Sequence, residues 1–356
     1  MRKVPQTVAQ NLKPKPEDET ALSFGAIFTD HMLLSDYAEG EGWHGMRIEP
    51  YRPFEMDPAC AVLHYGQSIF EGLKCYRGAN GCLRLFRARD NFGRLNVSAR
   101  RMSIPPLDVD ECMNGLLSLL ALEADWVPGA DGASLYIRPT IIATDNRLTV
   151  NASDTYCFFI ILSPSGPYYP GGLSPVSIYV EDEYVRAVRG GIGFTKASAN
   201  YAASLFAATI AHHKGYSQVL WLDGIEQKYI EEVGAMNIAF VFGETIVTPA
   251  LSGSILSGIT RDSILRIARD AGYAVEERKI SVDEVVGGIR SGALTEAFGT
   301  GTAAVVSPVG SLCYHGEAMT VGDGGVGGVT RRMYDTLVGI QKGDLPDPYG
   351  WTMEIK

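Results

Sequence analysis

Residues 190–205 read G-G-I-G-F-T-K-A-S-A-N-Y-A-A-S-L, and Lys196 carries the only charged side chain among them. A lysine held in an apolar, partly desolvated place loses part of its preference for the charged form, so the neutral, nucleophilic amine becomes available. A lysine that forms a Schiff base needs this environment. The alternative is a surface lysine on a loop, whose ammonium group reaches water.

The residues that follow extend this pattern. Asn200 and Tyr201 open a run of small residues that predicts a helix over 201–213 beside the lysine. Further along, Glu231 and Glu232 precede an apolar, strand-like run. One carboxylate could enter the interior, where it needs a cation such as a protonated pyridine nitrogen. The alternative is a solvated acidic pair at a strand edge.

Two further motifs are typical of anion sites. Residues 251–264, L-S-G-S-I-L-S-G-I-T-R-D-S-I, predict a glycine-containing turn and a helix with Thr260 as its N-cap. A helix N-terminus attracts phosphate, although a well-capped helix is the simpler interpretation. Residues 298–304, F-G-T-G-T-A-A, predict a tight turn in which Thr302 can bind an anion. Its alternative is a structural turn between strands.

Composition narrows the class of protein. The 356 residues are 46% hydrophobic and 20% charged, which suits a globular chain of two domains. A net charge of −10 argues against nucleic acid as a partner, because phosphate binding needs a basic surface. No signal-type segment or run of about 18 apolar residues is present, so we expect no membrane association and a cytoplasmic location. The six cysteines and six histidines show no metal-ligand spacing, and we expect free thiols and no metal.

The expected organisation is mixed α/β. Residues 1–20 are predicted to form a mobile N-terminal arm, 21–163 a small domain, and 176–356 a larger domain. Residues 164–175, rich in proline and glycine, are the expected interdomain loop. Helices are predicted over 89–102 and over 108–126, the second capped by Asp108. Residues 322–327 match G-x-G-x-x-G, but too little chain follows for the strands of a dinucleotide-binding fold.

The motifs T-K-A-S-A-N-Y, E-E-V-G-A-M-N, S-G-I-T-R-D-S and F-G-T-G-T-A-A occur in this order. Together they resemble the branched-chain amino-acid aminotransferases of the fold-type IV pyridoxal phosphate enzymes, from about residue 24 to 343. The resemblance implies a fold like that of D-amino-acid aminotransferase, with a mixed α+β small domain and a larger mixed α/β domain. It implies pyridoxal 5'-phosphate as cofactor and ping-pong transfer of an amino group from leucine, isoleucine or valine to 2-oxoglutarate. The reverse reaction would be the last step of branched-chain amino-acid synthesis.

The resemblance also assigns residues to the cofactor. Lys196 would form the Schiff base and then carry the proton, Glu232 would meet the pyridine nitrogen, and Tyr201 would meet the phenolic oxygen. The implied phosphate ligands are Arg94, in N-F-G-R-L-N-V-S-A-R, together with Ile259, Thr260 and Thr302.

Substrate contacts are implied by the same resemblance. The residues expected to line the pocket are Phe24, Tyr65, Phe70, Tyr136, Arg138 and Tyr168, although each aromatic residue alone is typical of ordinary core. Arg138 could hold a second carboxylate, and the amides of Thr302 and Ala303 would receive the first. Tyr65, Leu148 and Val150 would reach the neighbouring subunit's site, which implies a homodimer.

The sequence departs from the family pattern in three places. Ala197-Ser198-Ala199 replaces glycines, and Ala235 replaces a threonine of animal members. Ala304 and Ser307 stand where some animal members have a C-x-x-C pair, so thiol regulation is not implied. The rival functions are a D-amino-acid aminotransferase, an aminodeoxychorismate lyase, and a non-catalytic scaffold that kept the fold. The apolar cage and L-Y-I-R-P disfavour the first two.

Overall fold

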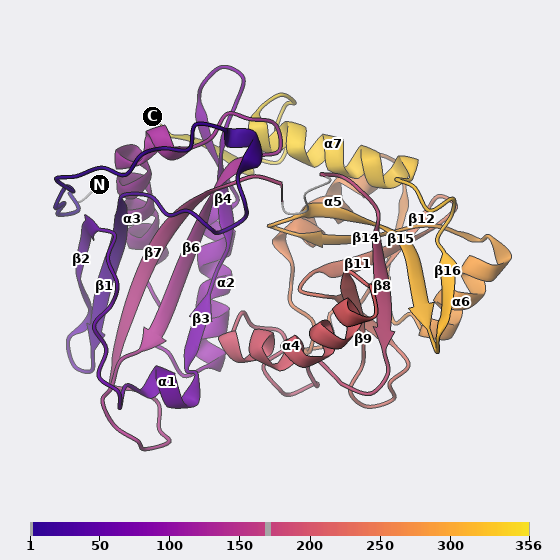
Figure 1. The fold of residues 1–356 in the computed structure, drawn as a ribbon, viewed down its shortest axis with the longest axis horizontal. Coiled ribbons are helices and arrows are strands. Elements are labelled where there is room, and N and C mark those ends of the chain that lie inside the picture. The colour runs from indigo at the N-terminus through magenta and orange to yellow at the C-terminus, as the bar shows by residue number, and fades with distance from the viewer. Residues whose placement is uncertain (1–2, 168–171, 356) are drawn as a thin grey trace. The chain divides into compact units, whose positions relative to one another are not determined.

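The computed structural model describes residues 3–167 and 172–355, and the chain forms two compact units (Figure 1). Unit 1 comprises Met1–Tyr168, Thr195–Ala199 and Ile340–Lys356, and unit 2 comprises Tyr169–Phe194 and Asn200–Gly339. The first change of unit falls within the expected interdomain loop at 164–175. The expected larger domain over 176–356 is not continuous, however, because the lysine segment and the C-terminal residues join unit 1.

Unit 1 is built on an antiparallel sheet with the strand order β17-β5-β4-β6-β7-β1-β2, in which β3 also pairs with β6. Its strands are β1 (His31–Ala38), β2 (Gly42–Pro50), β3 (Ser68–Phe70), β4 (Leu73–Arg77), β5 (Leu83–Phe86), β6 (Ser134–Ala143), β7 (Thr155–Ser165) and β17 (Thr352–Ile355). Its helices are η1 (Glu19–Ala21), α1 (Ala61–Tyr65), α2 (Ala88–Arg101), α3 (Val109–Leu122) and η2 (Ala124–Trp126). The C-terminal residues belong to this unit because β17 pairs with β5.

Helix α3 illustrates why these elements form. The Asp108 carboxylate accepts hydrogen bonds from the amides of Asp110 and Glu111, which confirms the predicted N-cap. Cys112, Leu116 and Leu119 are buried at helical spacing, and this face packs on β1 and β2. Apolar burial therefore fixes the helix against the sheet.

The N-terminal segment is bonded to unit 1. The Thr7 amide donates to the Ile48 carbonyl at 2.9 Å, and the Ala9 amide donates to Nε2 of the buried His31 at 2.8 Å. Lys13 donates its amide to Asp30 at 2.8 Å. The composition favoured a mobile arm over 1–20, whereas these contacts attach it to β1 and β2.

Unit 2 contains a mixed sheet with the order β10-β9-β8-β15-β14-β11-β12-β13, in which β16 also pairs with β15. Its strands are β8 (Val176–Glu181), β9 (Gln218–Leu222), β10 (Ile230–Val233), β11 (Asn237–Phe242), β12 (Thr245–Pro249), β13 (Ala274–Arg278), β14 (Leu294–Gly301), β15 (Val305–Tyr314) and β16 (Glu317–Thr320). The helices are α4 (Ser198–His213), α5 (Ile259–Asp270), α6 (Val282–Ser291) and α7 (Gly328–Lys342), of which α4 starts and α7 ends in unit 1. Buried residues of the sheet strands and of α6 form its main core.

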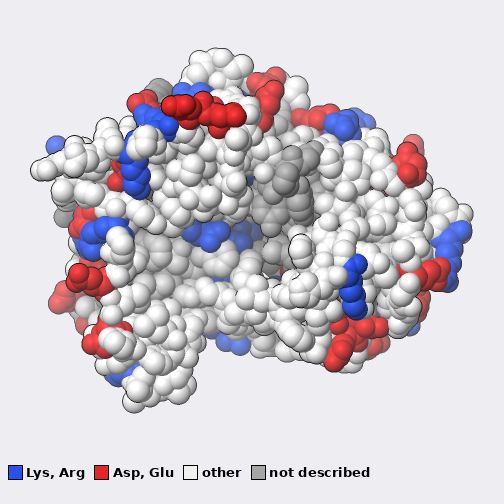
Figure 2. Space-filling view, viewed as in Figure 1, with Lys and Arg blue, Asp and Glu red and all other residues white. Residues whose placement is uncertain are grey.

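Surface and thiol chemistry agree with the composition. Acidic and basic side chains are interspersed on the face that Figure 2 shows. All six cysteines are free, and five of them are buried. Across residues 3–167 and 172–355, no helix has both the length and the apolar character that a membrane span requires.

Candidate functional site

The lysine segment is held along β3. The Lys196 carbonyl accepts a hydrogen bond from the Phe70 amide at 3.0 Å, and Ala197 forms a bridge with Ile69. Ser68 donates its hydroxyl to that of Ser198 at 2.7 Å. Because Ala197 is fully buried and Ser198 is bonded, small residues other than glycine serve in this segment.

The lysine itself is fixed from two sides. Its amide donates to the hydroxyl of Ser98 on α2 at 3.0 Å, and its Nζ lies 4.8 Å from the centroid of the Phe70 ring. The side chain is half-buried. Unit 1 therefore presents the amine against an aromatic face, as the sequence predicted for an apolar setting.

Three predicted substrate residues meet beside Phe70. Arg138 donates from Nη2 to the Tyr136 hydroxyl at 3.0 Å, and its guanidinium lies 4.6 Å from the Phe70 ring centroid. Phe24 meets Tyr136 edge to face at 4.7 Å. Tyr136 and Arg138 share one face of β6, as strand alternation predicted. Gly72 permits this arrangement, because an added Cβ would lie 2.0 Å from the tyrosine hydroxyl.

Arg138 is an unusual cation. Its Nε is buried and has no hydrogen-bond partner in the described part of the chain. Aromatic rings and one hydroxyl surround it, and no described carboxylate pairs with it. A half-buried guanidinium with unused donors is suited to an anionic ligand.

Arg94 lies on α2 in the same unit. Its Nε and Nη2 donate to the two carboxylate oxygens of Glu71 at 2.7 and 2.9 Å, and Glu71 is fully buried. The guanidinium is thus oriented by a bidentate ion pair next to Phe70 in the sequence. Its predicted contact with phosphate stays a prediction.

In unit 2, the Glu232 carboxylate lies at the centre of a buried polar group. Arg186 pairs with it at 2.7 Å, and the Leu256 amide donates to it at 3.0 Å. Asn237 donates to the same carboxylate at 3.4 Å and to the Leu256 carbonyl at 2.9 Å. The ion pair favours the charged carboxylate in the interior.

Both acids of the pair are buried, although the sequence predicted that only one would enter the interior. A register shift between Ile230 and Glu232 in the pairing of β10 with β9 breaks strict alternation at this point. Burial raises the pKa of Glu231, and the hydroxyl of Ser254, which donates to it, acts in the opposite direction.

The predicted phosphate helix is α5. It begins at Ile259 with Gly258 as its N-cap, so the prediction that Thr260 is the N-cap is wrong. Thr260 lies instead in the first turn, buried together with Ile259. Gly258 has no side chain to cap the helix, which leaves the helix dipole uncompensated by an N-cap oxygen. Asn237 links this end of the helix, through Leu256, to Glu232.

Thr302 and Ala303 lie in the turn that joins β14 to β15 and are half-buried. Val305, just after the turn, has φ of 62°, which is strained for a β-branched residue. Such strain is common at functional turns. Tyr201 is half-buried near the start of α4.

The three residues expected to reach a neighbouring subunit are exposed in unit 1. Tyr65 is 41% exposed, Leu148 63% and Val150 80%. The Tyr65 hydroxyl donates to the Leu148 carbonyl at 2.8 Å, so the structure brings these two together. Tyr168, the remaining predicted pocket residue, lies outside the described residues.

Some residues of these groups were missed from the sequence. Glu71 and Arg186 each pair with a predicted site residue, and Ser98 accepts the lysine amide. The available signal was weak: Glu71 is an acid between Phe70 and Gly72, and Arg186 lies upstream of the lysine in E-Y-V-R-A-V-R. Their partners come from distant parts of the sequence, which local pattern does not predict.

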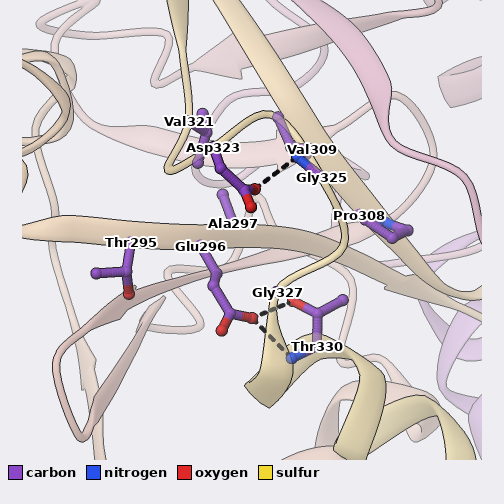
Figure 3. Close-up of a pocket in the computed structure, with 10 residues that line it drawn as sticks. All are labelled: Thr295, Glu296, Ala297, Pro308, Val309, Val321, Asp323, Gly325, Gly327 and Thr330. Atoms are coloured by element: carbon purple, nitrogen blue, oxygen red, sulfur yellow. Dashed lines mark hydrogen bonds between the residues drawn. The ribbon is translucent and has the colours of Figure 1, made fainter.

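The G-x-G-x-x-G motif has a structural role in unit 2 (Figure 3). The Glu296 carboxylate accepts the amides of Val329 and Thr330 at 3.0 and 2.8 Å, and so caps α7. An added Cβ on Gly327 would lie 1.9 Å from the carboxyl carbon of Glu296. A protein carboxylate therefore takes the place at the helix end where a dinucleotide fold would hold phosphate.

Comparison with known proteins agrees with this arrangement. The model of the family described as "Amino-transferase class IV" matches residues 68–312, and the chain belongs to this family. The "Branched-chain-amino-acid aminotransferase 2" of Bacillus subtilis is 54% identical over 343 residues, which cover 96% of this chain and 94% of that protein. Within the family, the chain belongs with the branched-chain-amino-acid aminotransferases.

Solved structures share the fold. The branched-chain amino acid aminotransferase of Escherichia coli is 28% identical, with a TM-score of 0.78 over 92% of this chain and 99% of that one. A second, a T.th. branched-chain amino acid aminotransferase with pyridoxamine 5'-phosphate, is 25% identical, with a TM-score of 0.75 over 91% of this chain and 98% of that one. The expected class of fold is confirmed.

Proposed function

We propose that this protein transfers the amino group of L-leucine, L-isoleucine or L-valine to 2-oxoglutarate, and catalyses the reverse reaction, with pyridoxal 5'-phosphate as cofactor. The names of its close relatives over nearly the whole chain support the substrate class. The cofactor is supported by the pyridoxamine 5'-phosphate in one structural neighbour. Within the molecule, the observation that carries the proposal is the half-buried Arg138 beside Phe70, in the same unit as Lys196.

The donor set fits this cofactor. Lys196 offers an amine against an aromatic face, and Glu232 offers a buried carboxylate that an arginine and an amide orient. The end of α5 and the turn at Thr302 are suited to phosphate. When bound, pyridoxal phosphate supplies an electron sink for the bond-breaking step at the substrate α-carbon.

Each predicted site residue receives a role. Lys196 holds the cofactor covalently and, once released, moves the proton as base and acid. Glu232 accepts the pyridine N–H, and Tyr201 hydrogen-bonds the phenolic oxygen. Arg94, Ile259, Thr260 and Thr302 bind the phosphate, and the amides of Thr302 and Ala303 take the substrate carboxylate. The side-chain pocket is formed by Phe24, Phe70, Tyr136, Arg138 and Tyr168 with Tyr65.

Acceptance of two kinds of side chain follows from Arg138. An apolar pocket binds leucine but excludes glutamate, since an unpaired buried charge is costly. The guanidinium supplies the missing partner for the distal carboxylate. When leucine is bound, the hydroxyl of Tyr136 and the ring of Phe70 still contact the arginine.

The proposed active unit is a homodimer in the cytoplasm. The exposed Tyr65, Leu148 and Val150 would contribute to the neighbouring subunit's pocket, and their exposure in the single chain supports this. Six free cysteines, five of them buried, are typical of a reducing compartment.

A panel of amino donors with 2-oxoglutarate tests the function. We expect L-leucine, L-isoleucine and L-valine to be used in preference to D-amino acids, and purified protein to absorb visible light from bound cofactor. Lys196→Ala should lose this absorption and lower turnover by about a thousandfold or more, because the residue is both the anchor and the proton carrier. Lys279→Ala, which changes an exposed lysine, is the matched control.

Three outcomes would reject the proposal. Activity with D-amino acids alone would favour a D-amino-acid aminotransferase, and colourless inactive protein would favour a scaffold. Near wild-type turnover in Lys196→Ala would reject the role of the lysine.

A further inference from the structure

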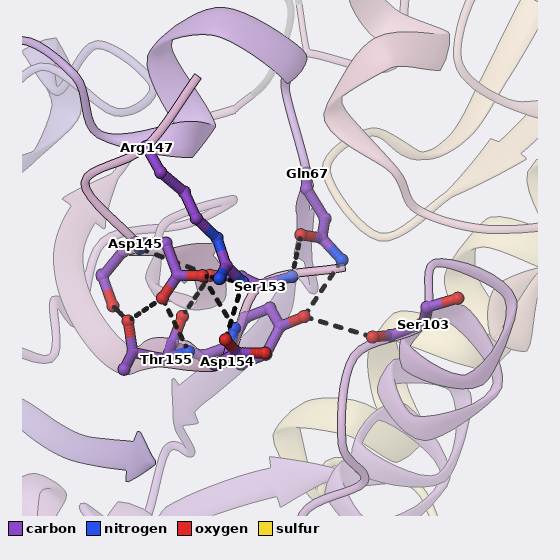
Figure 4. Close-up of polar contacts among 9 residues, drawn as sticks. Gln67, Ser103, Asp145, Arg147, Ser153, Asp154 and Thr155 are labelled. Carbon is purple, nitrogen blue, oxygen red and sulfur yellow. Dashed lines mark hydrogen bonds and ion pairs between the residues drawn. The ribbon is translucent and has the colours of Figure 1, made fainter. Parts of the chain in front are cut away.

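The connection between β6 and β7 is an exposed loop whose tip and base differ in character. Residues 148–152, Leu-Thr-Val-Asn-Ala, are all exposed and carry no charge. At the base, charged and polar side chains form a dense network (Figure 4). We call residues 148–152 the finger and the network of Asp145, Arg147 and Asp154 the clasp.

The clasp is held by one carboxylate with several donors. Asp145 accepts the amides of Asp154 and Thr155 at 2.9 and 3.1 Å and the hydroxyl of Thr155 at 2.8 Å. Arg147 bridges Asp145 and Asp154, at 2.7 Å from each. The two ends of the loop are thereby joined across the base of the finger.

The clasp is partly shielded from water and electrostatically strong. The Asp145 side chain is 10% exposed. Burial alone would raise its pKa, but the Asp154 amide, the Thr155 hydroxyl and the Arg147 guanidinium outweigh burial and hold the pKa of Asp145 below its usual range. A charge-assisted set of this kind fixes geometry more firmly than neutral hydrogen bonds.

A second set of contacts ties the base to the rest of unit 1. Gln67 accepts the Ser153 amide at 3.2 Å and donates to the Tyr156 hydroxyl at 3.1 Å and the Met102 carbonyl at 2.9 Å. Tyr156 in turn donates to the Ser103 carbonyl at 3.2 Å. The loop is thus anchored to the turn that follows α2.

Such anchoring is unusual for an exposed loop, and the finger uses it for nothing within its own unit. Leu148 and Val150 keep most of their surface exposed, and the Tyr65 hydroxyl fixes the Leu148 carbonyl from outside the loop. A rigid base that presents uncharged, apolar side chains is suited to a preformed contact with another apolar group, because its ordering cost is already met on folding.

We propose that Asp145 and Arg147 are positioning residues for side-chain selectivity, which act by holding the finger in the neighbouring subunit's substrate pocket. This inference rests on the proposed function and on its homodimer. The clasp touches neither substrate nor cofactor. It sets where Leu148 and Val150 stand against a branched aliphatic side chain, and it has no such effect on the distal carboxylate of glutamate, which Arg138 binds.

Arg147→Met tests the proposal, because it removes both ion pairs and keeps an apolar stem. We expect KM for leucine to rise about tenfold, the effect of losing an apolar contact in a pocket, with kcat changed less than about twofold. The ratio of kcat/KM for leucine to that for glutamate should fall accordingly. Arg147→Lys keeps the charge and should give an intermediate ratio.

The matched control is Arg290→Met. Arg290 is also an exposed arginine paired with a carboxylate, Glu317 at 2.5 Å, but it lies in unit 2. The control should leave the leucine-to-glutamate ratio unchanged. A general effect of removing a surface ion pair would appear equally in both variants.

A double-mutant cycle separates positioning from mere structural support. Leu148→Ala with Val150→Ala removes the finger's apolar contacts, and adding Arg147→Met to this variant should cause no further loss of selectivity. Losses that multiply fully, or an unchanged ratio in folded Arg147→Met, would overturn the inference. If Arg147→Met does not fold, Asp154→Asn breaks only the more exposed half of the clasp and is read by the same ratio. Wild-type protein without branched-chain activity would instead reject the proposed function.

Discussion

Among single residues, Arg138 combines a fixed orientation with unused donors. The Tyr136 hydroxyl holds one nitrogen, the Phe70 ring packs against the guanidinium, and Nε is buried without a partner in the described chain. Its energetic balance is therefore incomplete until an anion binds. The same residue is tolerable beside leucine because aromatic rings partly compensate a cation.

Arg138→Met should accordingly separate the two half-reactions. We expect the glutamate and 2-oxoglutarate half-reaction to lose about 2 kcal/mol or more, from the loss of a charge-assisted pair, and the leucine half-reaction to change much less. Single-turnover kinetics with each amino donor would measure this. Equal losses for glutamate and leucine would show that Arg138 is structural and that the second carboxylate is bound elsewhere.

Among the helices and strands, the end of α7 shows how a strand side chain replaces a local cap. Glu296 on β14 accepts the amides of Val329 and Thr330 and the Thr330 hydroxyl at 2.7 Å (Figure 3). The carboxylate also complements the helix dipole. This contact requires the close approach that the absence of a side chain on Gly327 permits.

Gly327→Ala should destabilise the protein by about 2 kcal/mol or more, because its Cβ would displace the capping carboxylate. Gly328→Ala is the matched control, since an added Cβ there has nothing within 4 Å. The control should be neutral or stabilising by about 1 kcal/mol at most, as alanine favours helix. Urea unfolding would measure both, and similar stability of the two variants would contradict the capping role.

Elements governed by local chemistry were predicted well from the sequence. The Asp108 cap of α3 is confirmed, and the strand predicted over 218–222 has the observed bounds of β9. The start of α5 was misplaced, because threonine is a good N-cap but the chain enters this helix through Gly258.

Long-range contacts set the limit of that prediction. The lysine segment joins unit 1 through hydrogen bonds to β3, more than a hundred residues earlier in the sequence. Both acids of the Glu231–Glu232 pair are buried through a bulge that alternation does not predict. The partners Glu71 and Arg186 likewise depend on tertiary placement.

For the protein as a whole, buried titratable groups set how stability depends on pH. Lys74 on β4 is almost fully buried, and burial lowers its pKa to about 8. Burial raises the pKa of the thiols of Cys75 and Cys157 to about 12. The lysine binds fewer protons in the folded state than in the unfolded state, whereas the thiols bind more.

These groups act in opposite directions. Between about pH 8 and pH 10.5 the unfolded chain binds the Lys74 proton more strongly, so this residue makes stability rise with pH. Above about pH 9 the unfolded thiols ionise while the buried ones do not, so stability falls. The wild-type profile mixes both effects, and a lysine variant isolates the first because the thiols are unchanged.

Lys74→Met should therefore stabilise the protein near pH 7 by up to about 3 kcal/mol, the free energy that corresponds to the shift in pKa. The advantage should shrink as the pH rises through about 8 and vanish near 10.5, where the wild-type lysine is neutral in both states. Urea unfolding of both proteins at fixed protein and cofactor concentration, at several pH values, would measure this difference. Lys279→Met, which changes a lysine that is 68% exposed, is the control and should not alter the profile. A variant less stable than wild type at every pH would mean that folding keeps Lys74 charged through a buried partner, so that removing the lysine breaks a pair rather than relieving a cost.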